Sequence, residues 1–491
     1  MRDNDVSQHK TINLTIKKEE HEASTPSQIQ ASLKYTGFSL FLAFHYSLWF
    51  LPNSFMGVNL LDNLVTYAWL VNLASTALAM IAIAFILGRN RRLSNYRILF
   101  FAIPLMLALT TLLLEYSTSI SNGAAATILC ALILGILEGF MWILWGECLV
   151  RNKAKFSLGT FGTLFGCFLL TSLVIGILLP APIVPLFNTG LVLISGFLLV
   201  KQNRSTSNEL PQLLPKSSTD KILSNIIAIG IMSFITSASS YYLASIIPWE
   251  TLAWGDDYFT YGTMSGGLIM IAVSLSFLAF KKFLSSFKLF PYLMVFLVIG
   301  SMLCFADSHF YLPGFIIALS VSSLLEVSLI MYFSTLTLRG YFTPAFAFTI
   351  AIASIRLGIV LGNGLSVFYE ANELVSSFGT ITLLIFACIT VLMIVPLVKR
   401  EPVLISLTSA PSSPSEVDVI CDQITNEFGL TERESEVLKL LARNMTVKAI
   451  SEKLFISPHT VSVHLRHIYD KTCIRKRNDL LDYINKRCDE K

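Results

Sequence analysis

The sequence has 491 residues, of which 54% are hydrophobic and only 14% are charged. Soluble domains carry about 25% charged residues, so this composition excludes an ordinary soluble globular protein. The net charge is +4, with 36 Lys and Arg residues against 32 Asp and Glu residues. This small total conceals an uneven distribution along the chain, and that distribution indicates a membrane topology.

Twelve apolar segments, each close to the roughly 20 residues that span a bilayer core, follow one another in two groups of six. The first group lies near 35–51, 64–87, 98–115, 124–150, 156–179 and 183–200. The second group lies near 222–247, 260–280, 289–306, 311–337, 345–369 and 376–398. A polar linker at 201–221 separates them. We therefore expect an all-α, polytopic twelve-helix membrane bundle with two six-helix halves, at 34–200 and 222–400.

In the loops between the predicted spans, and directly after the last span, basic residues occur only after even-numbered spans. These residues are Arg89, Arg91, Arg92, Arg97, Arg151, Lys153, Lys155, Lys201, Arg204, Lys216, Lys221, Lys281, Lys282, Lys288, Arg339, Lys399 and Arg400. The segments after the odd-numbered spans contain no Lys or Arg. Because cytoplasmic loops are enriched in Lys and Arg, we expect a multi-pass protein of the inner (cytoplasmic) membrane with both termini in the cytoplasm. The polar N-terminal tail at 1–33 has no apolar core, so no cleavable signal peptide is expected.

The sequence offers no pattern typical of catalysis, a cofactor or a metal. Eight cysteines are scattered without a CxxC pair, which argues against a zinc site or a disulfide framework. His459, His464 and His467 lie close together, but no Cys or acid completes a ligand set, so packing or backbone contacts are expected for them. No phosphate-binding loop or nucleophile constellation appears, so we expect neither an enzyme nor a cofactor.

The composition changes after Arg400. Prolines and serines are frequent between Pro402 and Ser415, which favours a flexible tether. As a coil of about 14 residues, it would reach roughly 20 Å. Apolar residues at helical spacing then predict a short amphipathic helix, at Val417, Ile420, Cys421, Ile424 and Phe428. Tether and helix occupy 401–428, before a final domain at 429–491.

The final domain has the signals of four short helices. Thr431 followed by Glu434 forms a capping box at the start of the first. The second begins near Thr446, the third after Ser457 with a proline at its first position, and the fourth near Asn478. A tight turn joins the middle pair, which is typical of a helix-turn-helix unit. Residues 443–477 include eight basic and two acidic residues, a net charge of +6. A solvated helical face would also explain this charge, but with the helical pattern it favours nucleic acid.

The segment LTERESEVLKLLARNMTVKAISEKLFISPHTVSVHLRHIYDKTCIRKRNDL resembles the DNA-binding domain of LuxR-type response regulators over about 60 residues. The matching positions are Leu430, Thr431, Glu434, Val437, Leu438, Leu441, Lys448, Ile450, Leu454, Ser457, Thr460, Val461, His464, Leu465, Ile468, Tyr469, Lys471, Arg475 and Arg477. The resemblance implies that the third helix enters the major groove of double-stranded DNA. It also implies that the fourth helix forms a homodimer on a pseudo-palindromic site.

Individual roles follow from the resemblance, position by position. Ser462, Val463 and Arg466 would face base edges, and Arg466 is the best candidate because Arg can bind guanine bidentately. Four further residues would hold phosphates, namely Lys448, Thr460, Arg475 and Arg477. Ser462 stands where the family usually has Lys, so the sequence preference is expected to differ. Cys473 stands where the family usually has Gly, so the turn before the fourth helix must form without glycine's conformational freedom.

The twelve spans in two sixes resemble the major facilitator superfamily. That family carries a Gly-x-x-x-Asp-Arg-x-Gly-Arg-Arg motif between spans 2 and 3. Here the loop reads Gly88-Arg89-Asn90-Arg91-Arg92, which keeps the glycine and the basic residues but lacks the acid. This departure counts against active transport.

Three charged residues stand near the middle of predicted spans, namely Glu138, Glu326 and Arg356. Buried charges are costly in a bilayer and usually face the bundle interior. We expect Arg356 to pair with a glutamate, to bind an anionic ligand group, or to exchange one for the other. Trp142 completes the candidate ligand site, with Trp145 on the same helix face. The alternative is that these residues form a static lock between the halves.

Other polar residues of the spans have weaker expectations. His45 and Trp49 in span 1 and Asn363 in span 11 are further candidates to face a central pore. Glu147, near the cytoplasmic end of span 4, is expected to meet basic loop residues.

Two functions fit these features. The first is a membrane-embedded one-component transcription regulator, which senses a small molecule in its twelve-span domain and binds DNA through its cytoplasmic tail. With a flexible tether, its output would be altered dimerisation or release of the tail rather than a rigid push through span 12. The second is a secondary transporter with a fused DNA-binding regulatory tail.

Overall fold

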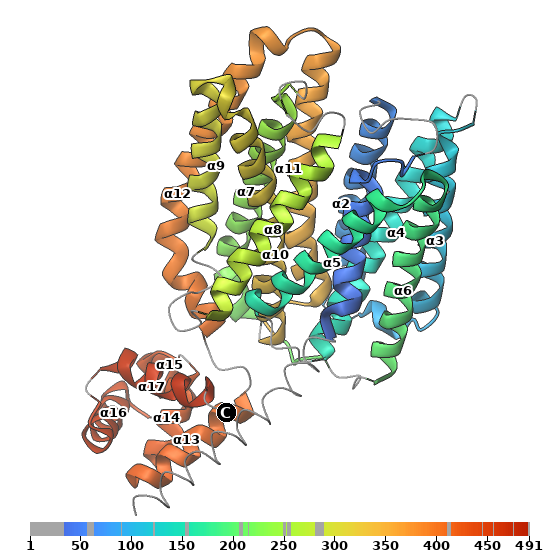
Figure 1. The fold of residues 1–491 in the computed structure, drawn as a ribbon. Coiled ribbons are helices and arrows are strands. Elements are labelled where there is room, and N and C mark those ends of the chain that lie inside the picture. Colours follow the sequence, from blue (N-terminus) through green and yellow to red (C-terminus); the bar gives the residue numbers. More distant parts are fainter. Residues whose placement is uncertain are drawn as a thin grey trace, which may run out of the picture. The chain divides into compact units, whose positions relative to one another are not determined.

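The computed structural model describes residues 34–55, 63–89, 91–120, 123–152, 157–205, 210–214, 216–248, 252, 257–279, 289–409, 414–443, 445–454, 456–474 and 476–489. All regular secondary structure within these residues is helical (Figure 1). The chain divides into two compact units, Met1–Glu401 and Pro402–Lys491. The predicted N-terminal tail lies outside the described residues.

The first unit is a bundle of long apolar helices. It contains a helix over 34–50, followed by α2 (Asn63–Leu87), α3 (Leu99–Ser117), α4 (Ala124–Arg151), α5 (Leu158–Leu178), α6 (Val184–Ser205), α7 (Lys216–Ile246), α8 (Tyr258–Ala279), α9 (Leu289–Ala306), α10 (Tyr311–Leu338), α11 (Pro344–Ala371) and α12 (Thr380–Ser409). Within the described residues, 11 helices are long and apolar enough to cross a membrane. The helix over 34–50 precedes them, and a twelfth span there stays a prediction. The protein is therefore a multi-pass membrane protein.

Two helix contacts relate the halves of this bundle. Helix α2 packs on α11, and α5 packs on α8. If the first six helices are repeated as the second six, α2 corresponds to α8 and α5 to α11. The repeat then makes the α2–α11 contact equivalent to the α5–α8 contact, and this supports two structurally equivalent halves. The linker between them is shorter than predicted, because α6 continues to Ser205 and α7 begins at Lys216.

Glycines allow close helix packing beside the charged residues. A side chain at Gly135 would overlap Ser75 and the backbone of Asn72, and one at Gly362 would overlap the backbone of Ala238. Small residues let membrane helices approach closely, where van der Waals packing replaces the hydrophobic effect. These contacts fix α4 against α2 and α11 against α7.

The second unit begins with the end of α12, from Pro402 to Ser409, and contains five further helices: α13 (Pro414–Phe428), α14 (Glu432–Ala442), α15 (Val447–Leu454), α16 (Pro458–Thr472) and α17 (Arg477–Asp489). The predicted capping box is present, because Thr431 and Glu434 each accept a hydrogen bond from the other's backbone N–H. Ser457 caps α16, with Pro458 at the first helical position as expected. The predicted helix starts in this unit are thus confirmed to within one residue.

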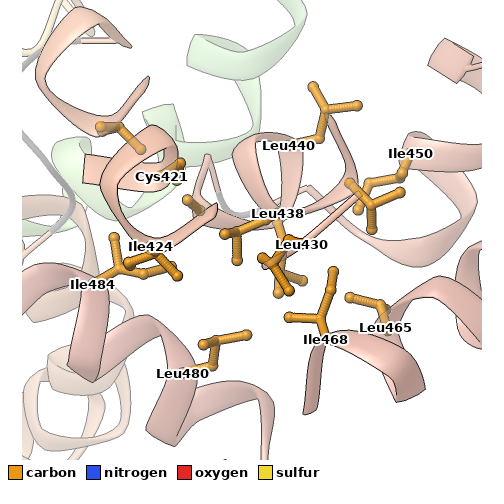
Figure 2. Packing of buried hydrophobic residues seen from close by; sticks show 14 of the residues in the cluster. Cys421, Ile424, Leu430, Leu438, Leu440, Ile450, Leu465, Ile468, Leu480 and Ile484 are labelled. Atoms are coloured by element: carbon orange, nitrogen blue, oxygen red, sulfur yellow. The ribbon is translucent and has the colours of Figure 1, made fainter. Parts of the chain in front are cut away.

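Helix α13 belongs to the core of the second unit. Its apolar face packs with residues of α14 to α17 in one cluster, shown in Figure 2. Ile424 and Cys421 are fully buried in that cluster. Three ion pairs join α13 to other helices of the unit, namely Asp418–Arg443, Asp422–Lys439 and Glu427–Arg487. The predicted four-helix domain is therefore a five-helix domain.

The prediction of a flexible tether is wrong for residues 402–409, which are helical. Helix α12 runs to Ser409 with Pro402 inside it, and α13 begins at Pro414. Leu404 and Leu407 in this stretch are buried, at 0% and 8% exposure. The Pro and Ser content of the segment drew attention away from the helical spacing of Leu404 and Leu407. Burial of these two side chains outweighs the cost of a proline inside a helix. Only residues 410–413 separate the two helices.

The place of α13 in the core gives a first prediction. Ile424→Ala should destabilise the C-terminal domain by about 2–5 kcal/mol, because a buried side chain is replaced by a cavity. Val419→Ala on the same helix is the control, since Val419 is 50% exposed. Hydrogen exchange in α14 and α16 of the full-length protein measures the effect. Equal exchange in both variants would show that α13 is not part of the folded domain.

Candidate nucleic-acid interface and buried polar network

Helix α16 has a buried face and a free face. Val461, Leu465 and Ile468 point into the core, whereas Ser462 and Arg466 are exposed and Val463 is half-buried. The alternation follows from the helical period. The structure thus presents the predicted base-reading side chains together on the side of α16 that faces away from the core.

The start of α16 is fixed by its cap. The backbone N–H of Thr460 donates to Ser457 Oγ at 3.0 Å, and the two hydroxyl oxygens are 2.8 Å apart. Ser462 Oγ donates to the carbonyl of Pro458. The predicted phosphate contact Thr460 therefore lies at the helix N-terminus, where backbone dipoles favour an anion.

A buried carboxylate joins α16 to α14. Glu434 Oε2 lies 2.7 Å from Lys471 Nζ and accepts from the backbone N–H of Thr431 at 2.8 Å. Desolvation raises the pKa of Glu434, but the hydrogen bonds from Lys471 and Thr431 outweigh it and lower the pKa to about 2. His467 Nδ1 lies 3.5 Å from Glu434 Oε1. Lys471 thus holds α16 against α14, a contact that the sequence pattern alone did not reveal.

The remaining predicted phosphate contacts are on α15 and around the start of α17. Arg477 donates to the carbonyl of Met445 at 3.0 Å, so part of its guanidinium holds the turn after α14. The side chain of Lys448 and the whole of Arg475 lie outside the described residues. Cys473, which ends α16, has a φ of +57°, so the turn forms in the left-handed conformation that glycine adopts most easily.

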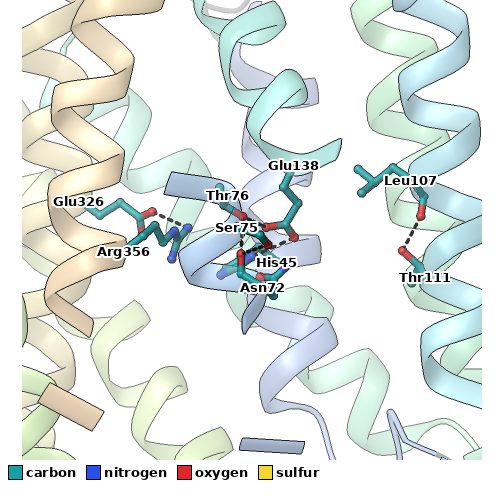
Figure 3. A network of polar contacts seen from close by, with 9 residues as sticks. All are labelled: His45, Asn72, Ser75, Thr76, Leu107, Thr111, Glu138, Glu326 and Arg356. Atoms are coloured by element: carbon teal, nitrogen blue, oxygen red, sulfur yellow. Dashed lines mark hydrogen bonds and ion pairs between the residues drawn. The ribbon is translucent and has the colours of Figure 1, made fainter. Parts of the chain in front are cut away.

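The predicted charges of the membrane unit meet in one buried network (Figure 3). Arg356 donates to Glu326 Oε1 at 3.0 Å, and the Tyr46 hydroxyl donates to Glu326 Oε2 at 2.6 Å. Arg356 belongs to the same half as Glu326, whereas Tyr46 belongs to the other half. The carboxylate of Glu326 thus connects the two halves.

Glu138 forms the second part of the network. It lies 3.1 Å from His45 Nδ1 and 3.4 Å from Thr76 Oγ1. Trp142, one turn further along α4, places its ring 5.8 Å from the Arg356 guanidinium, within range of a cation–π contact. The four predicted ligand residues are therefore brought together, with Arg356 paired to Glu326 and Glu138 paired to His45.

The network is closed to solvent but incompletely hydrogen-bonded. Glu138, Glu326 and Arg356 are 0%, 1% and 2% exposed. Among the described residues, no hydrogen-bond partner reaches Arg356 Nε, Trp142 Nε1, or the side-chain amide of Asn72. Leaving a buried donor or acceptor unpaired costs about 1–3 kcal/mol. A water molecule or a polar ligand group that hydrogen-bonds to these atoms would remove this cost.

Sequence reasoning missed Tyr46, Asn72 and Thr76, although polar residues inside apolar spans were the available signal. Trp145 and Trp142 both pack against Phe38, and the indole N–H of Trp145 donates to Ser195 on α6. The carboxylate of Glu147 accepts from the backbone N–H groups at 93 and 94. Backbone amides thus bind this acid, which was expected to meet basic side chains.

The pore candidates Trp49 and Asn363 meet elsewhere. They line a small cavity of about 50 Å³ together with Trp69 and Phe259. This cavity contains none of the three central charged residues.

Within the described residues, no group of three His, Cys, Asp or Glu side chains is arranged to hold a metal ion.

Comparison with known proteins identifies the C-terminal unit. Residues 429–484 match the family model of bacterial regulatory proteins of the luxR family. The oxygen regulatory protein NreC of Staphylococcus carnosus is 40% identical over 58 residues, which are 12% of this chain and 27% of NreC. An HTH-type transcriptional regulator of Mycobacterium bovis is 38% identical over 58 residues, 12% of this chain and 7% of that protein. The chain thus carries a LuxR-type, DNA-binding helix-turn-helix domain, and the match spans only a small part of these relatives.

One solved structure was also matched. The crystal structure of the human organic anion transporter MFSD10 (TETRAN) matches with a TM-score of 0.45 and 13% sequence identity. The match covers 75% of this chain and 97% of that chain.

The left-handed turn at Cys473 gives a second prediction. The left-handed conformation costs a residue with a Cβ about 1–2 kcal/mol. Replacement by glycine removes this cost, but glycine's greater conformational freedom in the unfolded state offsets part of the added stability. Cys473→Gly should therefore stabilise the C-terminal domain by up to about 1 kcal/mol, measured by hydrogen exchange in α16 and α17. Cys473→Ala keeps the Cβ and should bring no gain. If alanine stabilises as much as glycine, the thiol and not the backbone is responsible.

Proposed function

We propose that this protein is a membrane-embedded one-component transcription regulator. It senses a small molecule in its membrane domain and binds double-stranded DNA through its C-terminal domain. The observation that carries the proposal is the LuxR-type match at 429–484 in the same chain as 11 membrane-crossing helices. The confinement of Lys and Arg to alternate loops supports twelve spans in the inner membrane, with both termini in the cytoplasm. This topology places the helix-turn-helix domain where it can reach the chromosome.

DNA recognition is assigned to α16. Arg466, exposed on the free face of the helix, reads a base edge in the major groove, with Ser462 and Val463 beside it. The phosphate contacts are Lys448, Thr460, Arg475 and Arg477, which position the domain without specifying sequence. Two copies bind a pseudo-palindromic site as a homodimer through α17.

Ligand sensing is assigned to Glu138, Trp142, Glu326 and Arg356. Any ligand must displace an existing contact, because these side chains are buried and Arg356 is already paired. A ligand that replaces Glu326 at Arg356 would also free the carboxylate from Tyr46 of the other half. Binding would then shift the equilibrium between two arrangements of the halves.

The route from membrane to DNA runs through α12 and α13. Helix α12 continues for nine residues beyond Arg400, and only residues 410–413 separate it from α13. Helix α13 contacts the dimerisation helix α17 through the Phe428–Tyr483 ring pair and the Glu427–Arg487 ion pair. In this proposal, ligand binding alters dimerisation through α17 or releases the C-terminal domain, as expected from the sequence.

The DNA assignment predicts a specific loss in Arg466→Ala. Affinity for the cognate site should fall by about 1–3 kcal/mol, or roughly 5- to 150-fold, while binding to unrelated DNA changes little. Arg433→Ala is the control of equal charge, because Arg433 is 62% exposed and pairs with Glu436 on α14. Titration of both variants against cognate and unrelated duplexes at one salt concentration measures the difference. An equal loss on both duplexes would make Arg466 a phosphate contact.

The sensing assignment predicts that Arg356→Ala abolishes the reporter response to an inducing compound while the protein still inserts. Arg356→Lys keeps the charge and should retain a weakened response. A normal response in Arg356→Ala would leave the buried network as a static lock. Ion-gradient-dependent accumulation of the compound in vesicles would favour the transporter instead.

A further inference from the structure

A groove lies at the cytoplasmic end of α6. It has a volume of about 350 Å³ and is lined by Phe197, Val200, Lys201 and Arg204. The spacing of these residues by three, one and three places them on one helix face. The guanidinium of Arg204 lies 5.8 Å from the ring centroid of Phe101 on the neighbouring helix α3. The groove thus combines two cations with an aromatic and an apolar wall.

The walls of the groove continue as an exposed apolar surface. Phe197 is 68% exposed and Phe101 is 54% exposed, and further along the same helices Ile194 and Leu105 are 51% and 65% exposed. In a membrane-spanning bundle, such side chains face acyl chains. The apolar part of the surface therefore fits lipid rather than a water-soluble ligand.

The charged part of the groove fits a phosphate. Lys201 and Arg204 are both exposed, and Arg97 is exposed at the start of α3. The topology places these cations at the cytoplasmic leaflet. Basic pockets between membrane helices on this side suit anionic headgroups, and an Arg can hold a phosphate oxygen pair bidentately.

We propose that this groove binds an anionic phospholipid of the cytoplasmic leaflet. Lys201 and Arg204 hold the headgroup phosphate, and the acyl chains lie along the exposed faces of α3 and α6. The assignment uses the cytoplasmic orientation from the proposed function but needs neither the sensory ligand nor DNA binding. It is separate from the buried network, because none of its lining residues belongs to that network.

Native mass spectrometry of the full-length protein tests the assignment, with phosphatidylglycerol and phosphatidylcholine as competing probes. We expect the wild type to retain phosphatidylglycerol preferentially. Lys201→Gln with Arg204→Gln should lose this preference by roughly 10- to 30-fold, since each interfacial cation contributes about fivefold or somewhat less. The matched control is Lys399→Gln with Arg400→Gln, directly after the predicted last span, which removes the same charge and should retain the preference.

Two further measurements separate loss of lipid binding from misfolding, and binding of the whole lipid from binding of its headgroup alone. Lys201→Arg with Arg204→Lys keeps both charges and should retain the lipid, which separates lost binding from misfolding. Soluble glycerophosphoglycerol should not displace the lipid, because it lacks acyl chains. Equal losses in the two Gln pairs would indicate diffuse surface attraction and overturn the site. Absence of any preference in the wild type, or full displacement by the soluble headgroup, would also overturn it.

Discussion

The carboxylate of Glu326 is the constraint on which the membrane domain depends. A buried charge in a bilayer is tolerated when it is paired and hydrogen-bonded. Glu326 meets this condition with Arg356 of its own half and Tyr46 of the other half. The same contacts that stabilise the charge therefore join the halves of the bundle, and Figure 3 shows the Glu326–Arg356 pair. A ligand group that competes with Glu326 for Arg356 would act on this junction directly. The proposed sensor site and the proposed conformational switch therefore consist of the same residues.

Helix α13 is part of the folded C-terminal unit. It contributes Ile424 to the core that also contains residues of α16 (Figure 2). Its ion pairs reach α14 and α17. The domain thus folds together with the segment that follows α12.

Local patterns were readable from the sequence, and long-range pairings were not. The capping box at Thr431 and the cap at Ser457 depend on residues three positions apart, so the sequence predicted both. Spans were predicted because length and apolarity suffice to define them. The partners of Glu138 and Glu326 depended on how separate helices pack. His45 was expected to face a pore but not to pair with Glu138, and Tyr46 was not singled out in its aromatic-rich segment. The extension of α12 through Pro402 was missed because buried Leu404 and Leu407 outweighed local proline and serine content.

The central claim is that one chain both spans the membrane and occupies specific chromosomal sites. Crosslinking the full-length protein in intact cells, isolating the membrane fraction and sequencing the attached DNA tests it most directly. We expect the DNA crosslinked to the uncleaved chain to be enriched in a small set of sites that share an inverted repeat. Recovery of DNA only with a soluble C-terminal fragment, or uniform recovery across the genome, would contradict it.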